Sequence, residues 1–386
     1  MSVAGSARPH RDDLASSRYL AALTMLRFPA ALIVLLYHYF GAEIAALPGG
    51  RSLGALAIHG YLGVVFFFVL SGFILAHVHG NDLFGRDFGC PVRRRFYIAR
   101  IARVGPVLWL SLLLGLPAFL KALSDGGRVD PWLEASAMVL APLGLHAWVP
   151  GAACSLTCPT WSLSVEAFFY GLFPLVVAPV RAAPIRAIAV ALLSGLALAG
   201  AGDWVWLWAT GGVDPLLTYL PESRSGQLLR QAVLYNPLLH LPAFVCGVAG
   251  YTIWQTYQQS LRRSVVAALI GLLGLIVLCA TADDLPPVLR STVLPVPVFL
   301  LLIVASAQIP SRSAPLEWLG QISFALYAVH IPIYQIITSR TVMGPTLTAK
   351  LLATILSLIV AALVFRYLEG PGRRWVIQTF GTRTQH

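Results

Sequence analysis

Two side chains that could bind or transfer charged groups lie in one apolar stretch near the N-terminus, LTMLRFPAALIVLLYHYF (23–40). The stretch is long and apolar enough to cross a membrane as a helix. It contains Arg27 and His38, which are eleven residues apart and so project from almost the same helix face. Ionisable groups are costly inside a membrane, and this indicates a function. The structural alternative is that Arg27 extends to the interface and His38 hydrogen-bonds a neighbouring helix.

A second pair of basic side chains, Arg100 and Arg103, stands at the start of another apolar segment. The spacing of three residues puts both guanidinium groups on one helix face. Guanidinium groups bind phosphate oxygens through paired hydrogen bonds. Alone, the pair is explained by membrane orientation, but together with Arg27 it predicts a phosphate-binding site.

A carboxylate is embedded in the segment PTWSLSVEAFFY (159–170). Glu166 lies about two turns from the expected outer boundary, where a carboxylate must be paired or protonated. We expect it at a depth similar to that of His38. A carboxylate that orients an imidazole makes a general base, so Glu166 and His38 are the predicted catalytic residues. The alternative is a structural hydrogen bond from Glu166 to Trp161, Ser162 or a neighbouring helix.

Small residues mark the segment GYLGVVFFFVLSGFILAH (60–77). Gly60, Gly63, Ser71 and Gly72 favour the close approach of helices in a membrane. Ser71 is also a candidate for a hydrogen bond to a ligand or to the first helix.

A polar stripe follows one face of the segment WLGQISFALYAVHIPIYQ (318–335). Its members, at i, i+4, i+7 and i+11, are Ser323, Tyr327, His330 and Tyr334. Such a stripe faces the interior of a bundle or a cavity. We therefore regard His330 and Tyr334 as candidates for substrate binding, although helix packing explains the stripe as well.

The helices that must position these groups form a membrane domain. Of the 386 residues, 58% are hydrophobic and 11% are charged, whereas soluble domains have roughly 45–50% and 25%. We expect an all-α polytopic bundle of about ten transmembrane helices, with both termini on one side. The predicted spans lie near 23–42, 60–79, 102–121, 160–179, 184–201, 238–256, 263–280, 290–308, 319–338 and 348–368.

Basic residues orient this bundle. On the side of the termini lie 19 of the 27 Lys and Arg residues, which predicts cytoplasmic termini and a multi-pass protein of the inner cell membrane. The net charge of +11 then reflects topology, and no nucleic-acid partner is needed. The expected organisation is a tail at 1–22, a membrane domain at 23–368 and a second tail at 369–386. The N-terminal region lacks a signal-peptide cleavage pattern, so the first span is expected to be retained.

Two long external loops are expected, at 122–159 and 202–237. The first holds Cys154 and Cys158, which form either a short disulfide or two free thiols. The five cysteines are too scattered for a zinc site, so no metal is expected. The second loop contains three alternating tryptophans, which indicate either an interfacial belt or a strand-like aromatic platform for a sugar: Trp204, Trp206 and Trp208.

Five stretches, in this order, together resemble the acyltransferase-3 family of integral-membrane O-acyltransferases: LRFPAALIVLLYHYF, GYLGVVFFFVLSGFIL, FYIARIARVGPVLWL, PTWSLSVEAFFY and ISFALYAVHIPI. The resemblance implies about ten spans. It also implies transfer of an acyl group, commonly acetyl from acetyl-CoA, to a hydroxyl of a glycan, lipid or antibiotic.

The family's motif residues are matched by Arg27 and His38 in the first span, by Arg100 and Arg103 in an Arg-x-x-Arg motif, and by Trp161, Ser162 and Glu166 in a Trp-Ser-x-x-x-Glu stretch. Trp161 and Ser162 are thereby implied in substrate binding. The family's Pro-Glu in the sixth span is replaced here by Pro242–Ala243. Some members add a C-terminal esterase-like domain. This chain is expected to complete transfer within its membrane domain or on a separate envelope-assembly partner.

These observations predict one mechanism. Arg27, Arg100 and Arg103 bind the phosphates of cytoplasmic acetyl-CoA, and its pantetheine arm, roughly 15–20 Å long, reaches His38 eleven residues along the helix at about 1.5 Å each. His38, oriented by Glu166, either takes the proton of the acceptor hydroxyl or carries the acyl group transiently.

The acceptor is expected to be a glycan or glycolipid outside the cytoplasm. One alternative is a small natural product such as a macrolide. Another is that the protein is a proton-coupled secondary transporter, although no inverted repeat is found in the sequence. A third is a scaffold in envelope-polymer assembly, which would not need the aligned Arg27 and His38.

Overall fold

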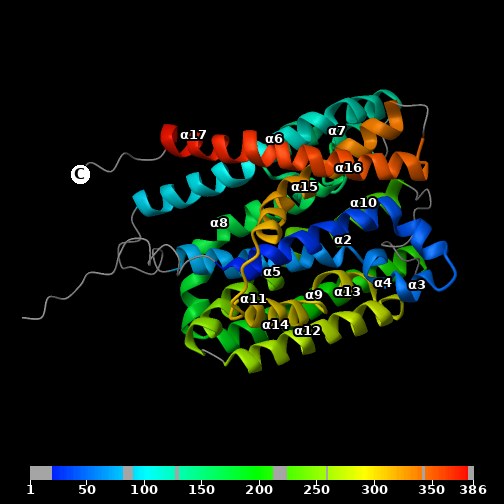
Figure 1. Cartoon of the computed structure of the whole chain (residues 1–386). Coiled ribbons are helices and arrows are strands. Elements are labelled where there is room, and N and C mark those ends of the chain that lie inside the picture. Colours follow the sequence, from blue (N-terminus) through cyan, green and yellow to red (C-terminus); the bar gives the residue numbers. More distant parts are fainter. Residues whose placement is uncertain are drawn as a thin grey trace, which may run out of the picture.

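Long helices lie side by side along one axis and form the body of the molecule (Figure 1). The computed structural model describes residues 20–80, 90–126, 130–211, 224–257, 260–340 and 344–380, without the side chains of Ser52, Leu53, Cys90, Ser339 and Arg340. Within these ranges every regular element is a helix. The predicted tails at 1–22 and 369–386 lie partly outside the described residues.

The helices of the body are α2 (Ala21–Ala46), α5 (Leu62–His79), α6 (Cys90–Ser124), α8 (Trp161–Ala182), α9 (Pro184–Thr210), α11 (Pro237–Thr256), α12 (Leu261–Thr281), α14 (Val296–Ser306), α15 (Ala314–Arg340) and α16 (Leu347–Val364). Shorter helices connect or extend them: α3 (Gly50–Leu53), α4 (Ala55–Ile58), α7 (Pro131–Leu140), η1 (His146–Trp148), η2 (Cys158–Thr160), α10 (Arg224–Leu234), η3 (Ala282–Asp284), α13 (Pro287–Thr292), η4 (Phe365–Glu369) and α17 (Gly370–Phe380).

Nine helical stretches among the described residues are long and apolar enough to cross a membrane. α13 and α14 together make one of them, Pro287–Ser306. α15 has the required length but is not among the nine, and it carries the polar residues Gln321, His330 and Gln335. The predicted all-α polytopic membrane bundle is confirmed, and the expected number of ten spans depends on α15.

The centre of the bundle is the pair α5 and α11, in which most residues are buried. A Cβ added at Gly72 of α5 would clash with the backbone carbonyl of Phe244, and one added at Gly247 of α11 would clash with that of Val69. Glycine at both positions therefore lets the two backbones touch. This confirms the expected packing role of Gly72.

Glycines also let α2 pack closely against both α5 and α15. A Cβ at Gly63 would meet the backbone carbonyl of Ala30, and one at Gly320 would meet that of Thr24. The helix that carries Arg27 and His38 is thus in backbone contact with both of its neighbours. Its side chains must then share the interior with those of α5 and α15.

Two helices are longer than expected. α6 begins at Cys90 and not near residue 102, because the arginine-rich run after Pro91 is itself helical and contains no helix breaker before Pro106. α9 continues to Thr210, so the three tryptophans lie on a helix and the strand-like alternation is wrong. Trp206 is 3% exposed, whereas Trp204 and Trp208 project outward, so they do not form one platform.

The first expected external loop contains α7 and two short 3-10 helices. A disulfide joins Cys154 and Cys158 there, which decides between the two alternatives left open by the sequence. Cys158 is also the first residue of η2, which leads directly into α8.

Candidate active site

Three arginines from two helices line one cavity of about 210 Å³, which we call the arginine cavity. Its walls come from α2, α5, α6, α8 and α15. The polar residues that line it are Arg27, Arg100, Arg103, Ser71, Ser162 and Glu166, together with Thr24, Tyr170 and Tyr327. The three arginines that the sequence assigned to one phosphate site therefore do come together.

Arg100 is fixed by contacts on α5, α6 and α8. Its Nη2 donates a hydrogen bond to Nε2 of His79, 3.1 Å away. The guanidinium also lies over the rings of Phe96 and Tyr170, with its central carbon 5.9 and 5.8 Å from the ring centres. His79 must be neutral to accept this hydrogen bond. It was not a candidate from the sequence; its place at the end of a span, eight residues after Ser71, is the only signal for it.

Arg103 is paired with Glu369, which lies in the π-helical turn η4. The opposite face of its guanidinium lies over the ring of Phe324, 5.3 Å from the centre. Glu369 is 2% exposed, so the carboxylate of this ion pair is buried, whereas Arg103 is partly exposed. Carboxylate and ring together fix the direction in which Arg103 points its remaining donors.

Glu166 also belongs to the arginine cavity. Its Oε1 accepts a hydrogen bond of 3.1 Å from the hydroxyl of Ser71. The expected contact with His38 is not formed, because the hydrogen bonds of His38 go to other residues. Trp161, the first residue of α8, lines the same cavity as His38, whereas Glu166 lies about 7.5 Å further along the helix and lines the arginine cavity.

His38 lines a second cavity of about 240 Å³, which we call the histidine cavity. Trp161 and Tyr235 stack in its wall with ring centres 4.7 Å apart. His240 lies 5.1 Å from the Trp161 ring and donates Nε2–H to the carbonyl of Leu234 at 2.8 Å. The structure thus puts Trp161 and His38 in one place.

The hydrogen bonds of His38 define its tautomer. Nδ1 lies 2.9 Å from the carbonyl of Val34 and 3.1 Å from Nε2 of His330. A carbonyl can only accept, so His38 Nδ1 carries the proton. None of the described residues hydrogen-bonds Nε2, which keeps its lone pair. A neutral histidine with this tautomer on the wall of a cavity is a competent general base or nucleophile.

His330 is itself held in one orientation. Its Nδ1–H donates to the carbonyl of Tyr327 at 2.7 Å, so its Nε2 is the acceptor for His38. The hydroxyl of Tyr39 donates to the backbone carbonyl of His330, and the Tyr39 ring stacks on Tyr334 at 4.9 Å. His330 therefore supports His38, and Tyr334 supports Tyr39; His330 and Tyr334 line neither cavity.

The two cavities share a wall. Val64 and Tyr327 line both of them. The hydroxyls of Tyr327 and Ser162 are 2.7 Å apart, and both are within hydrogen-bond distance of the carbonyl of Pro159, at 3.1 and 2.9 Å. We call Tyr327, Ser162 and Pro159 the polar septum. Tyr327 lines both cavities, Ser162 lines the arginine cavity and Pro159 lines the histidine cavity.

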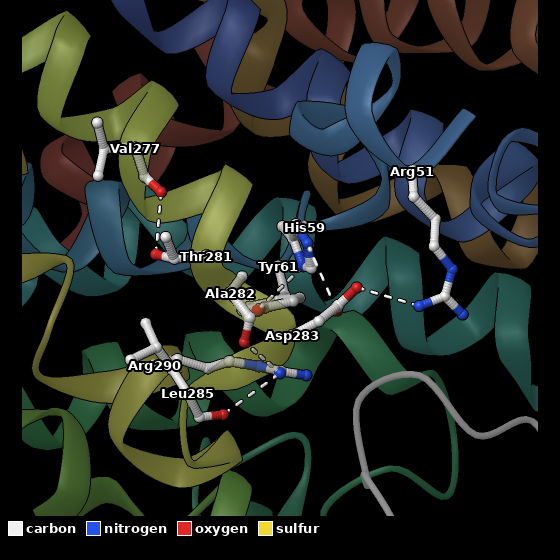
Figure 2. A network of polar contacts seen from close by, with 9 residues as sticks. All are labelled: Arg51, His59, Tyr61, Val277, Thr281, Ala282, Asp283, Leu285 and Arg290. Atoms are coloured by element: carbon white, nitrogen blue, oxygen red, sulfur yellow. Dashed lines mark hydrogen bonds and ion pairs between the residues drawn. The ribbon is translucent and has the colours of Figure 1, made fainter. Parts of the chain in front are cut away.

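A polar network supports the outer side of the histidine cavity (Figure 2). The hydroxyl of Tyr61, which lines the cavity, is 3.3 Å from Nδ1 of His59. Nε2 of His59 faces Asp283 at 3.8 Å, and Asp283 also accepts a hydrogen bond of 3.1 Å from Arg51. Arg290 lies next to this network and donates to the carbonyl of Ala282 at 2.6 Å. Sequence reasoning gave no indication of this network.

No group of three or more His, Cys, Asp or Glu that could hold a metal ion occurs in the part of the chain that the structure describes. The chemically active groups that line the two cavities are imidazoles, hydroxyls, guanidinium groups and the carboxyl group of Glu166.

Comparison with protein families decides the class. Residues 20–366 match the family model described as an acyltransferase domain. The chain belongs to the acyltransferase-3 family. This confirms the predicted acyltransferase family and, with the nine apolar helices among the described residues, a multi-pass membrane protein. The inner membrane and the cytoplasmic termini stay predictions.

Relatives of this acyltransferase differ in length. YrhL of Bacillus subtilis is 26% identical over 95% of this chain and 57% of its own. The peptidoglycan O-acetyltransferase OatA of Listeria monocytogenes is 23% identical over 93% of this chain and 56% of its own. The acyltransferase MdmB of Streptomyces mycarofaciens is 27% identical over 81% of this chain and 78% of its own. The chain thus spans little more than half of the first and second of these relatives. No solved structure matches it.

Proposed function

We propose that this acyltransferase moves an acetyl group from acetyl-CoA to a hydroxyl of a glycan or glycolipid. The observation that carries the proposal is the meeting of two cavities at Tyr327: one holds three arginines, and the other holds His38 with its Nε2 lone pair. A donor with phosphates suits the first cavity, and a hydroxyl suits the second. The O-acetyltransferase among the relatives supports the same reaction.

The positive charge of the arginine cavity indicates where the phosphates of the donor bind. Arg27, Arg100 and Arg103 provide a concentration of guanidinium groups that matches the phosphates of CoA. The distribution of basic residues favours a cytoplasmic location for this end of the bundle, where acetyl-CoA is available. The pantetheine arm would extend from the arginines toward the polar septum, over a helix length of roughly 16 Å between Arg27 and His38.

The chemical step uses Nε2 of His38. The acceptor hydroxyl gives its proton to Nε2 while its oxygen attacks the thioester carbonyl carbon. The carbon–sulfur bond breaks, and the CoA thiolate takes the proton from the imidazolium, so the products are an ester and CoA thiol. The hydroxyls of Tyr327 and Ser162 lie at the junction of the cavities. There, one of them would turn from the carbonyl of Pro159 or from its partner hydroxyl to donate a hydrogen bond to the developing oxyanion.

A two-step route uses the same nitrogen. Nε2 of His38 attacks the thioester, the carbon–sulfur bond breaks and CoA thiolate leaves. The acceptor hydroxyl then takes the acetyl group from the imidazole and gives its proton to the thiolate, so the products are again an ester and CoA thiol. His330 acts identically in both routes, because it accepts a hydrogen bond from Nδ1–H of His38 and thereby leaves the lone pair on Nε2 of that histidine.

The acceptor is proposed from the shape of the histidine cavity. Its 240 Å³ corresponds to about eight water molecules, which suits one sugar ring at a time. The aromatic wall of Trp161 and Tyr235 suits the apolar face of such a ring. A small natural product such as a macrolide is the second acceptor class to test.

Release of CoA thiol from acetyl-CoA tests the proposal. The purified full chain is assayed with peptidoglycan and with a macrolide as acceptors, beside His38→Gln and Arg103→Ala. We expect His38→Gln to bind CoA normally but to lose turnover, and Arg103→Ala to bind CoA at least tenfold more weakly. If both variants turn over like the wild type, the assignment of the two cavities is wrong.

Acid quenching during turnover separates the two routes. An acetyl group recovered on the peptide that contains His38 supports the two-step route. Its absence, at a time when the ester product is already forming, supports direct transfer.

A further inference from the structure

Glu369 is the protein partner of one of the three arginines that the proposed donor site needs. Its Oε1 accepts an ion-pair hydrogen bond from Nη1 of Arg103. The second carboxylate oxygen, Oε2, is buried and has no hydrogen-bond partner among the described residues. A buried carboxylate with one unsatisfied oxygen depends on its single cation, because a buried charge without a partner is strongly destabilising.

The backbone that carries Glu369 is irregular. α16 ends at Val364, the next five residues form the π-helical turn η4, and α17 begins at Gly370. π-helical turns are rare and frequently mark functional sites. They are less stable than α-helix, so η4 is the place in this segment where the backbone can rearrange most easily.

The helix that follows η4 contacts the helix that carries the arginine. α17 packs along α6, and the two lie side by side in Figure 1. A Cβ at Gly372 of α17 would lie 3.2 Å from Pro106 of α6, three residues after Arg103. A change in the Arg103–Glu369 pair is therefore transmitted directly to the contact between these helices.

Glu369 and a donor phosphate compete for Arg103 because both are negatively charged. Arg103 has several donor hydrogens but a single positive charge. A phosphate that binds Arg103 brings its own negative charge close to the carboxylate of Glu369, and like charges repel strongly where water is scarce. Glu369 is 2% exposed, so solvent does little to screen the repulsion.

We propose that Glu369 occupies the position on Arg103 where a donor phosphate binds, and that CoA displaces Glu369 and loosens η4 on binding. The inference rests on the proposed function, since it takes CoA as the donor. Glu369 then stabilises the protein before the donor arrives and weakens donor binding. It also sets specificity: only a ligand with more negative charge than one carboxylate displaces it, which favours CoA over a thioester without phosphates.

Calorimetric titration of CoA into the full chain in lipid nanodiscs tests this proposal. The variants are Glu369→Gln, which keeps the acceptor oxygen but removes the charge, and the matched control Glu43→Gln. Glu43 pairs with Lys350, far from the arginine cavity. We expect both variants to unfold at lower temperature, but only Glu369→Gln to bind CoA more tightly, by about tenfold.

The outcomes separate the inference from the proposed function. If the wild type binds CoA and Glu369→Gln binds it equally or more weakly, Glu369 is only structural and the inference fails, while the donor site stands. If the wild type does not bind CoA, the donor assignment fails and this inference with it.

Hydrogen exchange on the wild type gives a second test that needs no variant. CoA should slow amide exchange in α6 around Arg100 and Arg103, as a ligand normally does. In residues 365–372 it should speed exchange, because η4 loses the Glu369 contact. Protection of both segments by CoA would overturn the proposal.

Discussion

His38 and His330 face each other from α2 and α15, with Nδ1 of the first 3.1 Å from Nε2 of the second, although 292 positions separate them in the chain. The pair takes the place of the carboxylate–histidine arrangement that is common in general bases. A neutral imidazole fixes the tautomer of its partner as a carboxylate does, but it adds no negative charge. The imidazolium of His38 would therefore be short-lived, which suits a proton that passes directly from acceptor hydroxyl to leaving thiolate.

Two replacements of His330 should show whether this residue positions His38 or only packs in the protein interior. We expect His330→Leu to lower kcat by roughly tenfold to a hundredfold, because Nδ1 of His38 keeps only the Val34 carbonyl as partner. His330→Gln offers an oxygen near the position of Nε2 and should restore most of the activity. CoA affinity should be unchanged in both, as measured by titration. Equal impairment of the two variants would indicate a packing role only.

The polar septum makes a different prediction. Tyr327→Phe keeps the ring but removes the hydroxyl that lies between the cavities. We expect kcat to fall by about a hundredfold, the usual effect of losing one oxyanion donor, with CoA binding intact. Tyr334→Phe is the matched control, because that ring lines neither cavity. Weaker CoA binding by Tyr327→Phe would place the hydroxyl in donor recognition instead.

Arg100 should be sensitive even to a conservative change. Lysine keeps the charge but not the planar group that contacts His79 and lies over Phe96 and Tyr170. We expect Arg100→Lys to weaken CoA binding by about tenfold while kcat at saturating donor stays within a factor of two. Arg51→Lys, at the Asp283 pair, serves as control. If Arg100→Lys binds CoA as tightly as the wild type, then only the positive charge at this position contributes to CoA binding.

Much of the fold and of the donor site could be predicted from the sequence. Apolar length defines the spans, and helical spacing places Arg100 and Arg103 on one face without knowledge of any neighbour. Glu369 directly follows the last predicted span, at the same predicted membrane boundary as Arg100 and Arg103, and it pairs with Arg103. These features depend on the local helical periodicity and on the distribution of charged residues along the chain.

The surroundings of His38 could not be predicted in the same way. Its contact with His330 depends on how α15 packs against α2, and Gly320 fixes that contact through the backbone of Thr24. The expected pairing with Glu166 assumed that the two side chains lie at a similar depth in the membrane. An error of five residues along α8 is enough to move a carboxylate from one cavity to the other.

The contact between α5 and α11 predicts a strong effect of a small substitution. Gly247→Ala would place a methyl group against the backbone carbonyl of Val69, which cannot move without shifting α5. We expect a loss of about 1–3 kcal/mol in unfolding free energy. Gly171→Ala on α8 is the control, because no other atom lies within 4 Å of the added Cβ. Similar stability of both variants in thermal unfolding would mean that the helices separate at little cost.

His146 predicts a dependence of stability on pH outside the spans. Burial lowers the pKa of His146 from 6.5 to about 4, only partly opposed by its contact with Thr160. Between these two values the unfolded chain binds a proton at this position and the folded chain does not. Stability from this group is therefore complete above pH 6.5 and falls as the pH decreases toward 4, by up to about 3 kcal/mol.

Comparison of the wild type with His146→Gln isolates this contribution. Glutamine can still donate to the hydroxyl of Thr160, which His146 contacts through Nε2 at 3.2 Å, but it does not titrate. Thermal unfolding at pH 7 and pH 5 should show a larger destabilisation by acid in the wild type than in the variant. Equal losses in both proteins would mean that other groups carry the acid sensitivity and that the folded and the unfolded chain bind the proton of His146 equally well.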